Sequence, residues 1–284
     1  MPVYNAAATV ELAIRSIQYQ SLEDWELIVI DDGSVDQTRD IIAQVRDTRI
    51  RLIQEPHENL GLAARLNQCV QLARGRYVAR MDGDDVAYPQ RFARQVQYLE
   101  QHPEIDLLGS GAVVFKGEGE VVGLYPTACD HEGICRRPWW GFPLAHPTWM
   151  GRRTWFVSHP YREWCIRCED QDLLLRSFSH SKFAALEEVL LGYRMNDISA
   201  RKTGQGRLNY CRQLWNQSSD ISSLLKAARG VTVHGLAFGR DFLLAATGTF
   251  NRRSRLSFQP VNTQVRRQWC RVWTCLASEA VHNG

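Results

Sequence analysis

The sequence predicts an α/β fold with a mainly parallel sheet, and two observations lead to it. Strand-like and helix-like stretches alternate through the first two-fifths of the chain, and two acidic clusters each follow an apolar, strand-like run. Alternation of this kind is typical of parallel sheets whose crossover helices cover both faces. The chain has 284 residues, of which 44% are hydrophobic, so it is long enough to bury one sizeable core.

The first two-fifths of the chain contributes four strands and four helices to this prediction. The strands are the carboxyl end of one at MPVYN (1–5), WELIVID (25–31), RIRLIQE (49–55) and RYVARM (76–81). The expected helices carry apolar residues at helical spacing and start near Thr9, Ser34, Asn59 and Pro89. Asn59 is expected to cap the third helix, Gly75 to stop it, and Pro89 to lie in the first turn of the fourth.

The pattern changes after residue 104. Further strands are expected at IDLLGSGAVVF (105–115), EVVGLY (120–125) and ALEEVLLGYRM (185–195), with a short helix at EDQDLLLRSF (169–178). The aromatic, proline-rich stretch 136–150 predicts a loop or a pocket wall. Beyond about residue 205 only helical patches are recognisable, so we expect a catalytic domain, 1–204, and a helical region, 205–284.

Two clusters of carboxylates follow strands of the expected sheet, DDGS (31–34) and MDGDD (81–85). Ligands of open α/β sheets bind beyond the carboxyl ends of the strands, and hard divalent ions prefer oxygen ligands. Two acidic clusters at one edge therefore favour a cation shared with a ligand, although aspartate is also common in plain turns. The glycine motifs of dinucleotide sites and of P-loops are missing from the sequence.

Six segments, taken in order, resemble the family 2 glycosyltransferases: MPVYN, IDDGSVDQT, NLGLAARLNQCVQLARGRYVARMDGDD, HPTWMGRR, EDQDLLLR and VLLGYR. The resemblance covers residues 1 to about 200. It implies the nucleotide-diphospho-sugar transferase (GT-A) fold, a mixed and mainly parallel sheet flanked by helices, here with a helical C-terminal extension. It also implies a metal-dependent, inverting transfer of sugar to a hydroxyl of a cell-surface glycan or lipid-linked acceptor. UDP-sugars are the favoured donors, and GDP- and dTDP-sugars stay open.

The resemblance implies roles for residues on the nucleotide side of the site. Tyr4 and Asp32 are expected to bind the nucleobase, with Asp31 beside them, and Arg65 to reach the nucleotide. Asp82 lies nearer the ribose.

The resemblance also implies the groups that carry the reaction. Asp84, with Asp82, is expected to bind Mn²⁺ or Mg²⁺, and Asp85 to cap the turn. Asp170 matches the catalytic base, which takes the proton of the attacking hydroxyl. The bound ion offsets the charge on the leaving diphosphate, so no general acid is required.

Each of these roles has a structural alternative. Glu169 and Asp170 are also well placed to cap the helix that follows. Asp172 is expected to orient Arg176. His146 binds the acceptor or the diphosphate, or else only packs. Two cases stay open for the indoles of Trp139, Trp140 and Trp149, which either stack on sugar rings or pack in the core. Arg194 either contacts phosphate or pairs with a local carboxylate.

Two other functions compete with that of a glycosyltransferase. A nucleotidyltransferase normally has a glycine-rich, basic loop after its first strand, and YNAAATVE (4–11) is neither. A degenerate glycosyltransferase-like binding or scaffold subunit is the main alternative. The aspartates Asp32, Asp84 and Asp170 argue against it. The first strand argues for it, because Met1 lies near the end of a strand that usually begins earlier.

Charge is distributed unevenly along the chain. Residues 1–200 hold 21 Lys and Arg against 28 Asp and Glu, whereas residues 201–284 hold 13 against 3. Basic clusters at 251–255 and 265–271, close to Trp269 and Trp273, predict contact with an anionic membrane surface. Phe238, Phe242 and Leu243 add apolar side chains to this expected surface. The alternative is that these aromatic side chains pack on the acidic domain. Nucleic acid is not expected as a partner.

The same sequence indicates a cytoplasmic protein, peripheral on the inner face of the plasma membrane if its basic region binds lipid. It shows neither a signal peptide nor an apolar segment long enough to span a bilayer. Eight cysteines in a chain of this size do not predict a disulfide scaffold, and Cys129, Cys135, Cys165 and Cys168 are expected to be reduced, partly buried thiols. A zinc site built on Cys165 and Cys168 is disfavoured, because Cys129 and Cys135 do not have the matching spacing.

Overall fold

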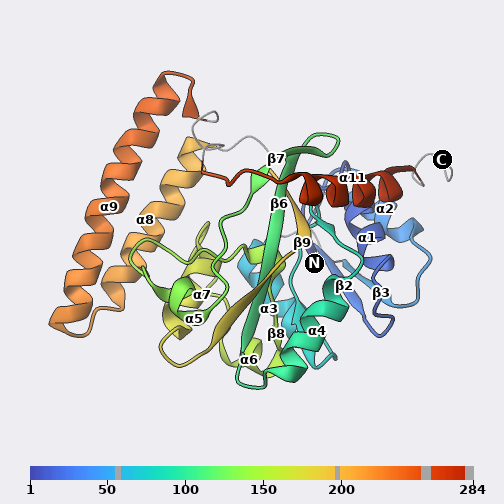
Figure 1. The fold of residues 1–284 in the computed structure, drawn as a ribbon, viewed down its shortest axis with the longest axis horizontal. Coiled ribbons are helices and arrows are strands. Elements are labelled where there is room, and N and C mark those ends of the chain that lie inside the picture. The colour runs from blue at the N-terminus through green and yellow to red at the C-terminus, as the bar shows by residue number, and fades with distance from the viewer. Residues whose placement is uncertain (55–58, 196–198, 251–256, 279–284) are drawn as a thin grey trace.

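The computed structural model describes residues 1–54, 59–195, 199–250 and 257–278 (Figure 1). Its strands are β1 (Pro2–Val3), β2 (Leu27–Asp31), β3 (Ile50–Gln54), β4 (Tyr77–Ala79), β5 (Val86–Ala87), β6 (Leu107–Lys116), β7 (Glu120–Leu124), β8 (Met150–Arg152) and β9 (Phe183–Arg194). Its helices are α1 (Val10–Gln18), α2 (Thr38–Gln44), α3 (Leu62–Leu72), α4 (Arg91–Gln101), α5 (His131–Cys135), the 3₁₀ turn η1 (His146–Thr148), α6 (Arg153–Ser158), α7 (Glu169–Ser177), α8 (Ala200–Asn216), α9 (Ile221–Ala246) and α11 (Thr263–Ser278).

The strands form two sheets of different character. The first is parallel, in the order β1-β2-β3, with Pro2 opposite Ile30 in the β1–β2 register. The second runs β4-β8-β6-β9-β5, with β7 paired to β6. In the second sheet β6 and β9 are parallel. A hairpin makes β6 and β7 antiparallel, and β8 runs antiparallel to both β4 and β6. The expected α/β fold is confirmed, with parallel pairs in the first sheet and a mixed second sheet.

One hydrophobic core links the two sheets. Val29 of the first sheet, Leu108 and Met150 of the second, and the inner face of α1 belong to a single cluster of buried side chains. Helix α1 buries Val10, Ala13, Ile14 and Ile17, the i, i+3, i+4, i+7 positions that its sequence predicts. Full burial of a valine or isoleucine side chain contributes about 1.5–3 kcal/mol, and burial of the alanine methyl contributes less. The core therefore holds the carboxyl ends of β2 and β4, and the acidic clusters that follow them, in fixed positions.

Three expected helix ends differ from the structure. Helix α3 takes Gly61, with a φ of 86°, as its N-cap in place of Asn59, because Asp32 binds the backbone amides at this point. It ends at Leu72, before Gly75. Helix α4 begins at Arg91, so Pro89 precedes its first turn. The first strand is short, as expected, with only two residues.

The C-terminal region has two separate parts (Figure 1). Helices α8 and α9 form a hairpin at one end of the molecule, held by the Arg207–Asp241 ion pair at 3.0 Å. Helix α11 instead returns to the second sheet, where Trp269 is fully buried and donates to the Gly119 carbonyl at 2.7 Å. The expected boundary at residue 204 lies inside α8, and the two-domain division stays a prediction. No described helix is both long and apolar enough to cross a membrane.

Candidate active site

The acid turn (82–85) joins β4 to β5 and gathers three carboxylates. Ligand oxygens of Asp82, Asp84 and Asp85 all lie within 4.8 Å of one another. Asp82 is half-buried and accepts a hydrogen bond from Arg80 Nη1 at 2.6 Å. Asp85 is fully buried, and its Oδ1 accepts from the Arg194 amide at 2.8 Å. Asp85 therefore fastens the turn to the end of β9, and the expectation that it caps the turn is wrong.

The acid turn fits a divalent cation on electrostatic grounds. Burial and the charge of Asp82 raise the pKa of Asp84 to about 6. Burial and the neighbouring carboxylates raise the pKa of Asp85 well above its usual range. Asp85 Oδ2 is buried and has no hydrogen-bond partner among the described residues. A hard cation would neutralise this repulsion and supply a partner for the orphaned oxygen.

Arg80, at the carboxyl end of β4, is a site residue that we did not predict from the sequence. Its buried side chain donates a hydrogen bond to Asp82. Its charge partly offsets the rise that burial causes in the pKa of Asp84, Asp85 and Asp170. Charge effects of this kind require the groups to be close. Arg80 thus links the acid turn to Asp170. The sequence did contain a signal for Arg80: a basic residue at the end of an apolar strand, just before three carboxylates.

Asp170 lies in the first turn of α7 and is half-buried. Burial raises its pKa, and hydrogen bonds from Gln171 oppose the rise, the side-chain bond reaching Asp170 Oδ2 at 3.2 Å. The charge of Asp170 also helps burial raise the pKa of Tyr125 to about 12. A raised carboxylate pKa suits a general base, because it narrows the gap to the pH at which the enzyme works.

The segment that carries Tyr4 is fastened directly to the acid turn. Thr9 Oγ1 donates to the Gly83 carbonyl at 2.9 Å. A Cβ on Gly83 would lie 2.7 Å from Val3 Cγ1, so only glycine allows this approach. Tyr4 itself is 50% exposed and free to present its ring to a ligand. The structure thereby brings the Tyr4 segment and the acid turn together.

Asp31 and Asp32 follow β2 and already have several partners. Both oxygens of Asp31 accept from the Ser34 amide, Arg39 pairs with it, and its side chain is fully buried, so it shapes the turn. Asp32 accepts from the Leu60 and Gly61 amides, each at 2.9 Å, and from Arg65 Nε at 2.7 Å. A carboxylate offers about four acceptor positions, which leaves Asp32 about one for a ligand.

The structural alternatives for four other residues can now be compared with their contacts. Asp172 is fully buried and binds Arg176 at 2.8 Å, as expected. His146 is buried, and its Nε2 lies 2.8 Å from the Tyr161 hydroxyl, which is a packing position. Trp149 is fully buried in the core. Arg194 contacts backbone oxygens, donating to the Asp84 and Gly117 carbonyls at 2.8 Å each.

The remaining predictions concern Trp139, Trp140 and the cysteines of the disfavoured zinc site. Trp140 is exposed and stacks on His234 of α9 with ring centroids 5.6 Å apart, and Arg229 of α9 covers Trp139. The sulfurs of Cys165 and Cys168 lie 2.9 Å apart as free thiols. Within the described residues, the acid turn is the sole cluster with metal-binding geometry, so the structure gives no support to a zinc site.

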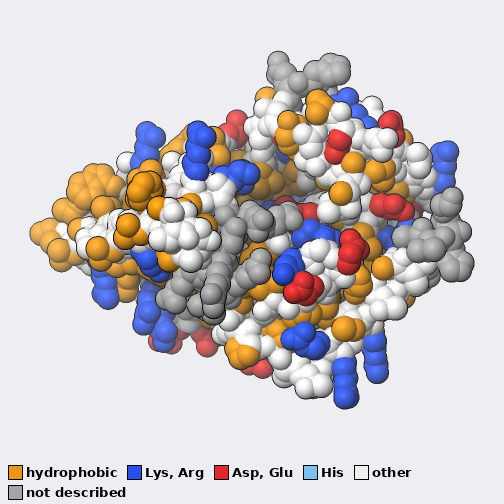
Figure 2. All heavy atoms as spheres, turned by 90° about the horizontal axis from the view of Figure 1, so that it is seen from above, with side chains coloured by type: hydrophobic (Ala, Val, Ile, Leu, Met, Phe, Trp, Pro, Cys, Tyr) orange, Lys and Arg blue, Asp and Glu red, His pale blue; other side chains and the backbone are white. Residues whose placement is uncertain are grey.

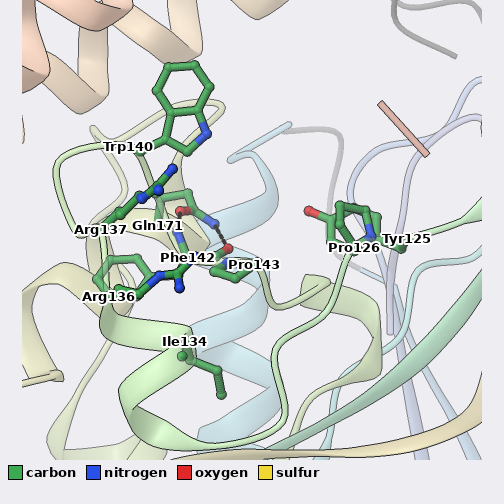
Figure 3. Close-up of a pocket in the computed structure, with 11 residues that line it drawn as sticks. Tyr125, Pro126, Ile134, Arg136, Arg137, Trp140, Phe142, Pro143 and Gln171 are labelled. Carbon is green, nitrogen blue, oxygen red and sulfur yellow. Dashed lines mark hydrogen bonds between the residues drawn. The ribbon is translucent and has the colours of Figure 1, made fainter. Parts of the chain in front are cut away.

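A cavity of about 340 Å³ is lined by Gln171, the hydrogen-bond partner of Asp170 (Figure 3). Arg136, Arg137 and Trp140 line it on the same side as Gln171, and Tyr125 and Pro126 lie across from them (Figure 3). We call it the arginine pocket. A larger cavity, of about 700 Å³, has none of the predicted site residues among its described lining.

Comparison with known proteins agrees with this geometry. Residues 1–158 match the model of the family described as glycosyl transferase family 2. The EpsE protein of Bacillus subtilis (strain 168) is 37% identical over 203 residues, which is 69% of each chain. The amylovoran biosynthesis glycosyltransferase AmsE of Erwinia amylovora is 27% identical over 242 residues, or 84% of this chain and 87% of AmsE. The chain belongs to glycosyl transferase family 2.

Two solved structures show the same fold. S. aureus TarS 1-349, in complex with UDP-GlcNAc, superposes with a TM-score of 0.64 at 16% identity, over 97% of this chain and 78% of TarS. The mannosyltransferase PcManGT from Pyrobaculum calidifontis, in complex with GDP-Man and Mn²⁺, gives a TM-score of 0.55 at 15% identity, over 99% and 85%. The protein is thus a glycosyltransferase with the GT-A fold, as its sequence predicts.

Proposed function

We propose that this glycosyltransferase is metal-dependent and inverting, and that it takes its sugar from a nucleotide-diphospho-sugar. The observation that carries the proposal is the gathering of three carboxylates in the acid turn, beside Arg80, whose charge acts both on the turn and on Asp170. A divalent ion needs oxygen ligands, and an attacking hydroxyl needs a base on the other side of the sugar. One base and one cation site match a single displacement, which inverts the anomeric centre.

The residues of the chain divide this work between them. Asp84, with Asp82, would hold Mn²⁺ or Mg²⁺, which offsets the charge on the leaving diphosphate. Asp82 lies toward the ribose and is positioned by Arg80. Asp170 takes the proton of the acceptor hydroxyl. Glu169 is next to it in the first turn of α7, where a carboxylate also favours the helix.

The nucleotide side of the proposed site is formed by Tyr4, Asp31, Asp32 and Arg65. The exposed Tyr4 ring stacks on the base, and Asp32 uses its remaining acceptor position for a base N–H. Arg65 keeps Asp32 oriented through their 2.7 Å bond. Asp31 acts indirectly, by fixing the turn through Ser34 and Arg39.

The donor can be identified from thermal stability. We expect one of UDP, GDP or dTDP to raise the melting temperature more with Mn²⁺ than with EDTA, because a ligand that binds only the folded state stabilises it. UDP is our first choice, consistent with the UDP-GlcNAc complex of TarS, and the GDP-Man complex of PcManGT keeps GDP in the panel. Absence of any metal-dependent shift across the three nucleotides would favour a scaffold subunit.

We also propose that the acceptor is a cell-surface glycan or its lipid-linked precursor. AmsE, which matches 84% of this chain, is described as an amylovoran biosynthesis glycosyltransferase. That description supports polysaccharide biosynthesis as the setting of the reaction. It also raises the question of how the enzyme reaches a membrane-bound acceptor.

The structure changes which residues we propose for membrane contact. Trp269 is fully buried and Trp273 packs on Phe115 with ring centroids 5.3 Å apart, so α11 keeps these aromatics against the sheet. The basic cluster 251–255 lies outside the described residues. Helix α9, which carries the expected Phe242 and Leu243, exposes apolar side chains along one face. We call this face the apolar stripe: Ile221, Leu225, Leu236 and Leu243, with Phe242 beside them.

Charge supports a lipid surface as the occupant of the apolar stripe. Figure 2 shows hydrophobic side chains gathered on the α8–α9 end, with Lys and Arg along its edges. The hairpin carries Arg201, Lys202, Arg212, Lys226 and Arg229, which sit well beside anionic headgroups at about 1 kcal/mol each. Bulky apolar residues flanked by cations are typical of helices that lie in a bilayer interface.

Co-sedimentation with liposomes tests this contact. We expect salt-sensitive binding to anionic vesicles and none to neutral ones. The double change Leu236→Asp/Leu243→Asp should reduce binding at least about tenfold, because both side chains lie on the stripe and are 74% and 66% exposed. Val157→Asp, at an exposed position of α6, is the control. Failure to bind either kind of vesicle would rule the contact out.

A further inference from the structure

Resting on the proposed function, we infer that the acceptor is anionic and that Arg136 and Arg137 bind its negative group in the arginine pocket. The pocket adjoins the proposed base, because Gln171 both lines it and donates to Asp170. An acceptor in this pocket would place its hydroxyl toward Asp170, on the Gln171 side, and its negative group against Arg136 and Arg137. Figure 3 shows the two arginines and Gln171 around the pocket.

The walls of the pocket carry positive charge only. Arg136 and Arg137 are adjacent in sequence and exposed, and none of the described residues that line the pocket is acidic. Neither guanidinium is paired with a carboxylate among the described residues, although other arginines of this chain form many such pairs. Arginine presents a planar set of donors that matches carboxylate and phosphate groups. Two of them on one side of a cavity suit an anion.

The pocket also provides a surface for a sugar ring. The exposed indole of Trp140 is held in place by its stack on His234. Gln171 is fixed by the Phe142 backbone, whose amide donates to its Oε1 at 2.7 Å. Gly141, with a φ of 123°, allows the loop to approach, since a Cβ there would lie 2.9 Å from that oxygen. The wall is therefore preorganised, which lowers the cost of binding.

The position of the pocket relative to the apolar stripe is consistent with this assignment. His234 and Arg229, which contact Trp140 and Trp139, belong to α9, the helix that carries the stripe. The negative group has two sources with the same chemistry, the diphosphate of a lipid-linked acceptor or the carboxylate of a uronic acid. Both present an oxyanion to the arginine pair.

Three probes separate these sources and the neutral case: hexyl glucoside, hexyl glucuronide and the hexyl diphosphate ester of glucose. Their affinities are measured by saturation-transfer NMR with Mn²⁺ and UDP present in excess, so that the donor site is already filled. We expect the charged probes to bind at least about tenfold more tightly than the glucoside, and more weakly as salt rises. The tighter of the two charged probes identifies the source.

The double change Arg136→Gln/Arg137→Gln should remove that preference, bringing charged and neutral probes to within about twofold. The control is Arg46→Gln, an exposed arginine far along the chain that pairs with no described carboxylate. Binding of UDP with Mn²⁺, measured by calorimetry, should be the same in all three proteins. A wild-type protein that binds none of UDP, GDP and dTDP would refute the proposed function itself.

Two results would overturn the anionic acceptor while leaving the proposed function intact. The first is equal binding of the three probes, or binding of none, by wild-type protein that binds UDP. The second is a preference for charged probes that persists in the double arginine variant.

Discussion

Replacing Asp170 with asparagine should lower sugar transfer at least about 10²-fold while leaving donor binding unchanged. Asparagine keeps the shape of the side chain and can still accept a hydrogen bond from Gln171, but it cannot take a proton. The measurement is steady-state transfer, alongside calorimetric binding of the donor nucleotide with Mn²⁺. A fall in transfer without a fall in binding places Asp170 at the chemical step.

Glu169→Gln is the matched control for this change. Glu169 precedes Asp170 in the first turn of α7 and is also half-buried, and burial raises the pKa of its carboxyl too. If the two carboxylates only stabilised the helix N-terminus, both changes would cost a similar, small amount of stability. Near-normal turnover in Asp170→Asn would remove this residue from the mechanism.

Replacing Asp84 with asparagine should abolish the tightening of nucleotide binding by Mn²⁺. The substitution removes one negative oxygen from the acid turn, where the pKa of Asp84 is raised to about 6 by burial and by Asp82. A hard cation depends on such oxygens, so affinity in Mn²⁺ should fall to the value seen in EDTA. Calorimetry of the nucleotide, with and without metal, gives this difference directly.

Two further variants show whether the loss of the metal effect is specific to Asp84. Asp40→Asn makes the same chemical change on the exposed face of α2 and should keep the effect of the metal. Asp85→Asn should lose less than Asp84→Asn, because Asp85 Oδ1 is already bound by the Arg194 amide. Equal losses in Asp84→Asn and Asp85→Asn would show that Asp85, through its orphaned Oδ2, is a ligand of equal weight.

Local patterns were enough to predict the strands β1–β4 and the helices α1–α4, but not β5 or α5. The buried face of α1 and the apolar run of β2 can be read directly, since one has helical period and the other is continuous. The ends of elements were predicted less well. Asp32 sets the start of α3 from 28 residues away, by binding the Leu60 amide, and no local signal at Asn59 reveals that bond.

The candidate site was predicted from acidic motifs, so a basic residue was passed over even though Arg80 bonds Asp82, two residues along the chain. The sequence does not show that the charge of Arg80 also acts on Asp170, which only the fold brings near. Trp269 shows the same limit in the C-terminal region. Its neighbours Arg267 and Arg271 suggested a membrane face, whereas the ring is buried against Phe115 and Gly119. Only the folded chain separates that packed helix from the exposed α9.

The most direct test of the central claim is the configuration of the sugar released when water replaces the acceptor. With an α-linked donor and Mn²⁺, proton NMR of the first product should show the β-anomer before mutarotation, because one displacement assisted by Asp170 inverts the centre. The release should stop in EDTA and in Asp170→Asn. Initial appearance of the α-anomer, or release at the same rate without metal, would contradict a metal-dependent, inverting transferase.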